Sequence, residues 1–187
     1  MEINENMIRQ YGLSEADWNL AMSCFVPELV KAGGRFVKLG SVSEKIGFVG
    51  SGLLRSFFYD DDANEITTDF FQPGSMIISV ESFNNQVPAT ENVVAIEDSS
   101  LFVISFQKLQ ELYQAIPVWH TICKDMADAK NNDLIARSVQ FQTLTATERY
   151  RLFCQQNREV AKKAALGHIA SYLGIDIATL SRIRRKK

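Results

Sequence analysis

The chain has 187 residues, of which 46% are hydrophobic and 22% charged, and its formal net charge is −2. That length suffices for one mid-sized domain and a smaller second one. No apolar run approaches the length of a membrane span, and the acidic start, residues 1–5, does not resemble a signal peptide, so we expect a cytoplasmic protein with no membrane partner.

Metal or cofactor chemistry is not expected from the cysteine and histidine content. Cys24, Cys123 and Cys154 are scattered and form no CxxC pair, which favours a reducing compartment. The two histidines, His120 and His168, lie far apart in the sequence, so no metal site is predicted. His168 falls in a predicted helix, where we expect it on the helix surface or at a phosphate.

The first predicted helix begins after Ser14. Asp17 follows three residues later, which resembles a capping box with aspartate in place of glutamate. Trp18, Met22 and Phe25 recur at helical spacing and are predicted to form its inner face.

Residues 33–105 have the pattern of short β-strands. Runs rich in branched and aromatic residues alternate with turns rich in glycine, proline, aspartate and asparagine. The predicted strands are 35–39, 45–49, 53–59, 65–72, 93–96 and 100–105. Many short strands at this spacing predict a sandwich, barrel or jelly roll.

Two helices are predicted next, a short one from Phe106 to about Gln114 and a long one from Pro117 to about Gln142. The long helix would span roughly 39 Å. Its apolar stripe is interrupted by the polar residues 130–133. We expect it to pair with its symmetry mate in a homodimer, and the alternative is that it packs on its own β domain.

The end of the chain has the spacing of a helix-turn-helix, preceded by a helix that Thr145 and Glu148 would start with a capping box. Ala170 supplies a small side chain where two helices would cross, and Gly174 can end the first of them in the left-handed region. Asp176 can cap the second helix by accepting a hydrogen bond from the amide of residue 178 or 179. The inner faces would carry Ile169, Leu173, Ile175, Leu180 and Ile183.

The outward face of the second helix carries the residues predicted to contact DNA. Ile177 and Ala178 lie at its N-terminus, nearest the bases, and Arg182 is best placed to read a guanine through two hydrogen bonds. Arg184 is expected at a phosphate, and Lys186 and Lys187 at phosphates or in a tail. The full predicted set is Ile177, Ala178, Thr179, Ser181, Arg182, Arg184 and Arg185.

Positive charge is concentrated in this segment. Residues 157–187 hold eight lysines and arginines against two acidic residues, whereas residues 1–156 hold twelve against twenty. The acidic balance of the whole chain therefore does not argue against DNA binding. The alternative is an ordinary helical hairpin that ends in a solvated basic tail.

A β domain, a long helix and a C-terminal helix-turn-helix together resemble the Crp/Fnr family of bacterial transcription regulators. The residues that carry the likeness are 169–175 (IASYLGI) and 179–184 (TLSRIR). Residues 147–150 (TERY) resemble the preceding helix of a short branch common in Bacteroidetes. Residues 44–59 resemble the hairpin of a cyclic-nucleotide-binding β-roll, and residues 71–74 (FQPG) the turn before its phosphate cassette.

The resemblance implies an α+β fold in three parts. Residues 1–116 would form an N-terminal double-stranded β-helix of the jelly-roll, cupin-like type. Residues 117–143 would form a long dimerisation helix, and residues 144–187 a C-terminal helix-turn-helix domain that binds DNA.

The cassette departs from the family pattern, in which a Gly-Glu pair precedes an arginine that holds the cyclic phosphate. Ile78 and Ser79 stand in place of the pair, and Ala89, followed by Thr90, stands in place of the arginine. Glu81 is one acid that could still bond a hydroxyl. Because no lysine or arginine occurs between positions 55 and 108, and a buried phosphate without a cation is costly, we predict no response to cyclic AMP in the usual way.

The recognition helix departs too, because Ile177 and Ala178 stand where the best-known members have Arg-Glu. The DNA site should therefore differ, and a contact with a thymine methyl is plausible at these positions. In place of a cyclic nucleotide, the β domain would bind another small, less anionic effector, or no effector at all.

These observations predict a homodimeric DNA-binding transcription regulator. Its partners would be double-stranded DNA and, at a promoter, RNA polymerase, with the effector unidentified. The alternative is a small-ligand- or cyclic-nucleotide-binding module whose helix-turn-helix serves protein contacts. An enzyme is not expected, because the chain has no nucleophile elbow, no P-loop and no clustered histidines.

Overall fold

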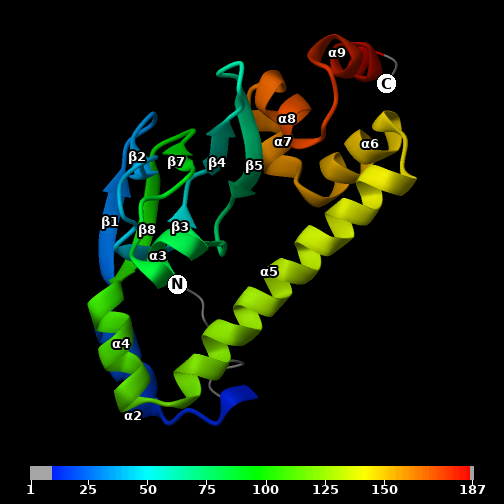
Figure 1. The fold of residues 1–187 in the computed structure, drawn as a ribbon. Coiled ribbons are helices and arrows are strands. Elements are labelled where there is room, and N and C mark those ends of the chain that lie inside the picture. The colour runs from blue at the N-terminus through cyan, green and yellow to red at the C-terminus, as the bar shows by residue number, and fades with distance from the viewer. Residues whose placement is uncertain (1–9, 186–187) are drawn as a thin grey trace.

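The structure is a computed structural model that describes residues 10–185. Two four-stranded sheets pack face to face, and helices follow them in sequence, so the predicted α+β class with a β-roll, a long helix and a helix-turn-helix is confirmed (Figure 1). The expectations for residues 1–5 and for Lys186 and Lys187 lie outside the described residues.

Antiparallel pairing organises both sheets. The first sheet contains, in spatial order, β1 (Val26–Val30), β8 (Ser99–Ser105), β3 (Lys45–Ser51) and β6 (Met76–Ile77). The second contains β2 (Arg35–Val37), β7 (Asn92–Ala95), β4 (Leu54–Tyr59) and β5 (Glu65–Phe71). Leu54, Ile77 and Leu101 are fully buried between the sheets, where alternate residues of each strand point inward.

Two strands and two short helices escaped the sequence prediction. β1 contains Pro27, which argues against an internal strand, and β1 is indeed the edge strand where proline is tolerated. β6 has two residues, and α3 (Val80–Asn85) has six, too few for a periodic pattern. α7 (Arg158–Lys163) likewise has only six residues and lies between α6 and the helix-turn-helix.

A second core, called the lower core below, lies at the end of the sandwich remote from α9 (Figure 1). It joins α2 (Glu15–Ser23), α4 (Phe106–Ala115) and the start of α5 (Val118–Thr143). Ser14 caps α2 with the predicted capping box, and Pro117 begins α5 as predicted. Trp18, Met22 and Phe25 pack against this core, although Phe25 follows the end of the helix.

The long helix α5 carries the chain from this lower core to the other end of the molecule (Figure 1). α6 (Ala146–Gln156) then begins at Thr145 with the predicted capping box, and α7, α8 (Leu166–Tyr172) and α9 (Ile177–Arg185) complete the chain. Among residues 10–185, no helix combines the length and apolar character needed to cross a membrane.

Candidate DNA-binding site and sensing cavity

The turn between α8 and α9 has the backbone that the sequence predicts. Gly174 has a φ of 59°, and a Cβ there would lie 2.9 Å from Cε1 of Phe141 at the end of α5. The Arg149 side chain on α6 donates hydrogen bonds to the carbonyls of Leu173 (3.1 Å) and Leu144 (2.9 Å). The turn is therefore fixed to α5 and α6, and the positive φ favours glycine at position 174.

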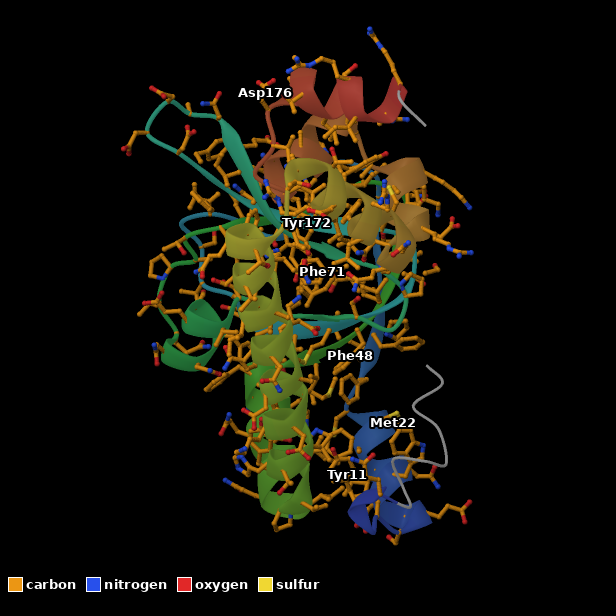
Figure 2. All side chains as sticks on the ribbon, turned by 90° about the vertical axis from the view of Figure 1, so that its right-hand side faces the viewer. Tyr11, Met22, Phe48, Phe71, Tyr172 and Asp176 are labelled. Carbon is orange, nitrogen blue, oxygen red and sulfur yellow. The ribbon has the colours of Figure 1, made fainter. Side chains whose placement is uncertain are left out.

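Asp176 caps the second helix of the motif. Its Oδ1 accepts hydrogen bonds from the amides of Ala178 (2.9 Å) and Thr179 (3.1 Å), so both of the predicted partners are present. In Figure 2, Asp176 lies at the top of the molecule beside α9, with Tyr172 below it. The cap leaves the amide-rich end of α9 and its first residues facing outward.

The outer side of α9 is exposed and basic. Ile177 (53% exposed), Ala178, Arg182, Arg184 and Arg185 are exposed, while Thr179 and Ser181 are half-buried. Leu180 on the opposite side is fully buried.

The predicted Arg182 side chain is oriented by its own helix. Its Nη2 donates a hydrogen bond to Oγ1 of Thr179, three residues earlier, at 2.9 Å. Within residues 10–185 no other hydrogen bond of this guanidinium is seen, and one planar group offers five donors. Arg182 is thus exposed and held by Thr179, and its contact with a base stays a prediction.

The inner side of the motif shares its core with the β domain. Ile169, Leu173, Ile175 and Leu180 are buried as predicted, and Leu53, just before β4, and Phe70 on β5 belong to the same cluster. The Phe70 ring centroid lies 5.3 Å from that of Tyr172 and 6.2 Å from that of Phe153. The helix-turn-helix is therefore packed onto the sandwich in this structure.

His168 was expected on the helix surface or at a phosphate. Its side chain is partly buried rather than fully on the surface, and the phosphate contact stays a prediction. His168 lies half-buried between α8 and β5, with Nε2 4.0 Å from Oε2 of Glu65, which in turn is ion-paired with the buried Arg55. Its Nδ1 is buried and, among the described residues, has no hydrogen-bond partner. Burial lowers the pKa of His168, the charge of Arg55 lowers it further and the charge of Glu65 opposes both. Burial and Arg55 together favour the neutral imidazole.

A cavity of about 590 Å³ lies between the second sheet and α5. Ser56, Thr68 and Phe71 line its sheet side, and Lys130 and Arg137 its helix side. Lys130 is ion-paired with Asp69, and Nη1 of Arg137 donates to the carbonyl of Thr68 at 2.6 Å. These two cations were missed by the sequence prediction because they lie on α5, 61 and 69 positions after the residues of β5 that they contact.

The cassette residues divide between the cavity and the surface. Ile78 lines the cavity and Ser79 is buried, whereas Glu81 and Thr90 are exposed and Ala89 is buried without lining it. Three acids line the cavity, Asp69, Asp133 and Glu91. Glu91 was missed by the sequence prediction, although its place directly after Ala89-Thr90 was a usable signal. Burial raises the pKa of Glu91, a hydrogen bond from Ser79 opposes the shift, and the charge of Asp69 adds to it.

The cavity therefore offers carboxylates and hydroxyls more readily than free cations. Both basic side chains that line it already have partners on β5: Lys130 is ion-paired with the Asp69 carboxylate, and Arg137 donates to the Thr68 carbonyl. Within residues 10–185, no group of three or more histidines, cysteines and acids is placed to hold a metal ion.

The comparisons with known proteins agree with this architecture. Residues 27–115 match the cyclic nucleotide-binding domain family. No curated protein sequence matches. Among solved structures, FixK2 from Bradyrhizobium japonicum is similar with a TM-score of 0.72 and 16% identity, over 87% of this chain and 83% of that one.

Two further solved structures are similar over most of their length. The c-di-GMP-responsive global regulator CLP from Xanthomonas campestris has a TM-score of 0.69 and 15% identity, over 92% of this chain and 91% of that one. A putative transcriptional regulator of the Crp/Fnr family from Eubacterium rectale has a TM-score of 0.72 and 17% identity, over 95% and 84%. Residues 27–115 thus match the cyclic nucleotide-binding domain family, and the chain as a whole has a fold similar to that of the Crp/Fnr regulators.

Proposed function

We propose that this chain is a DNA-binding transcription regulator that acts as a homodimer. The observation that carries the proposal is α9, a capped helix whose buried side completes a helix-turn-helix and whose outer side is exposed and basic. Such a helix fits the major groove, where arginine side chains can read base edges. The proposed contacts are Ile177, Ala178, Thr179, Ser181, Arg182, Arg184 and Arg185.

The proposed dimer contact is the middle and end of α5. Leu134 (44% exposed), Ile135 (55%) and Val139 (52%) present apolar side chains to solvent, although they lie on a helix whose start is buried. Covering such a surface with a second copy would remove apolar area from water. Dimerisation would also place two recognition helices on successive major grooves.

The proposed division of labour follows the three predicted segments. Residues 1–116 would sense an effector in the cavity, residues 117–143 would dimerise and residues 144–187 would bind DNA. RNA polymerase is the further partner that such a regulator would meet at a promoter. A non-enzymatic role is part of the proposal.

DNA binding is tested by selecting duplexes from genomic fragments with the full-length protein and titrating the selected duplex at increasing salt. A dimer making six to ten phosphate contacts should lose roughly 10³- to 10⁵-fold in affinity between 50 and 200 mM salt, because condensed counterions are released on binding. Absence of selection above background, or an affinity independent of salt, would favour the alternative of a module whose helix-turn-helix contacts protein.

Cyclic AMP is expected not to bind in the cavity with the stoichiometry of a resident effector. Ala89 provides no cation for the phosphate, and Lys130 and Arg137 would have to leave their partners on β5 to serve one. Isothermal titration of the full chain with cyclic AMP and cyclic GMP should show no saturable heat at micromolar concentrations. A tight one-to-one isotherm per protomer would refute this expectation.

A further inference from the structure

The free edge of β5 is closed by side chains rather than by another strand. β5 is the last strand of its sheet, and within residues 10–185 no strand pairs with its outer side. The Ser171 hydroxyl on α8 accepts a hydrogen bond from the amide of Thr67 (2.9 Å) and donates one to the carbonyl of Glu65 (3.2 Å). One hydroxyl thus satisfies two of the backbone groups that a neighbouring strand would otherwise pair.

Apolar and polar contacts extend this junction inward. The ring of Tyr172, the residue after Ser171 on α8, packs against the ring of Phe70 on β5. Further along, Nε2 of Gln72 donates to Oδ1 of Asn157 at 3.1 Å. The name "α8–β5 junction" is used below for the contacts of Ser171, Tyr172 and Asn157 with Glu65, Thr67, Phe70 and Gln72.

The junction leaves the DNA-facing side of α9 uncovered. Figure 1 shows α8 next to β5, with α9 beyond it at the outer end of the molecule. Ile177, Ala178 and Arg182 remain exposed while Ser171 contacts the strand. A contact that blocked DNA binding would cover that side, so the junction orients the recognition helix and does not mask it.

We propose that Ser171 is a positioning residue for DNA recognition, which fixes α9 relative to α5 by closing the edge of β5. The proposal rests on the proposed function as a dimeric DNA-binding protein. Two recognition helices read successive major grooves only when they lie about 34 Å apart. A loosened junction would leave each helix able to enter one groove but would let the separation of the two vary.

The consequence is specific to paired half-sites. If both recognition helices are held at the right separation before binding, less conformational entropy is lost on binding than with two loosely attached helices. Binding to a single half-site uses one helix and does not depend on the separation. Ser171 should therefore contribute to the affinity for two half-sites and to the preference for one spacing, without contributing to half-site affinity.

The test uses the full-length protein and the duplex obtained by selection, together with its isolated half-site and versions with one base pair added or removed between half-sites. Ser171→Ala is compared with Ser23→Ala, which also removes a serine-to-carbonyl hydrogen bond, of 2.7 Å, but on α2 far from α9. Ser171→Ala should weaken two-half-site binding about three- to tenfold, the equivalent of one or two net hydrogen bonds. It should leave half-site affinity within about twofold and flatten the spacing preference, whereas Ser23→Ala should change none of these.

Hydrogen exchange provides a readout of the junction itself. The exchange rate of the Thr67 amide should increase in Ser171→Ala and stay the same in Ser23→Ala, because the amide loses its acceptor only in the first variant. Should Ser171→Ala fail to fold, Gln72→Ala loosens the same junction from the strand side and should show the same pattern more weakly.

Equal losses on the half-site and on the full site would overturn the proposal, because Ser171 would then act on the DNA contact or on the motif's own stability. A faster Thr67 amide with unchanged full-site affinity and spacing preference would overturn it as well. If the wild-type chain bound no duplex at all, the proposed function itself would fail, which the half-site titration of the wild type reveals separately.

Discussion

Arg182→Ala is expected to remove sequence discrimination by the protein while leaving its fold intact. Arg182 is exposed on α9, and its only hydrogen bond among the described residues is the one to Thr179 at 2.9 Å. A bidentate contact between arginine and guanine contributes about 1–3 kcal/mol of discrimination, roughly five- to 150-fold for each half-site. In a dimer, both half-sites lose the contact, so the selected duplex should become nearly equivalent to unrelated DNA.

The measurement is an anisotropy titration of the selected duplex and of duplexes with each guanine replaced in turn. Wild-type protein should bind more weakly when one particular guanine of each half-site is replaced. Arg182→Ala should bind the original duplex and the duplex with that guanine replaced with equal affinity. Lys38→Ala is the control, since it removes an exposed cation after β2, and it should alter neither affinity nor discrimination. Circular dichroism confirms the fold. Unchanged affinity and specificity in Arg182→Ala would contradict the assignment of α9 as the reading helix.

Trp119→Ala is expected to produce the largest loss of stability among single substitutions in α5. Trp119 is 4% exposed and lies in the lower core with Leu109, Leu112 and Ile122, which are buried to a similar degree. Truncation of a buried tryptophan removes its transfer free energy and leaves a cavity, which together cost about 3–5 kcal/mol. The lower core attaches α5 to the β domain, so both should lose stability together.

Urea unfolding at a fixed protein concentration measures this effect, because dimerisation makes apparent stability depend on concentration. Thr121→Ala is the matched control on the same helix, where the side chain is exposed, and it should change the free energy of unfolding by no more than about 0.5 kcal/mol. A loss below about 1 kcal/mol in Trp119→Ala would show that α5 is held to the sandwich by other contacts.

The helix-turn-helix could be predicted almost residue by residue because its constraints are local. Gly174 must adopt a positive φ, Asp176 must reach amides two and three positions ahead, and buried residues must recur at helical spacing. The capping boxes at Ser14 and Thr145 are local in the same sense. Such features depend on a few neighbouring positions, so the sequence alone specifies them.

The cavity and the junction could not be predicted, because they depend on which distant segments meet. His168 has the spacing of a surface residue on its own helix, and only the approach of β5 places it beside Glu65. Lys130 and Arg137 likewise gain their roles from the position of α5 across the second sheet. Their sequence neighbours give no sign of these contacts, since the partners lie more than 60 residues away.

Ser171 closes an edge that is synthesised 106 residues earlier. At 5–20 residues per second, the ribosome delivers α8 roughly 5–20 s after β5 has emerged. During that interval β5 is an unpaired edge, which is a template for pairing with a strand of another nascent chain. The hairpin that precedes it carries Asp60, Asp61 and Asp62, and this run of like charge opposes such edge-to-edge aggregation until the last helices arrive.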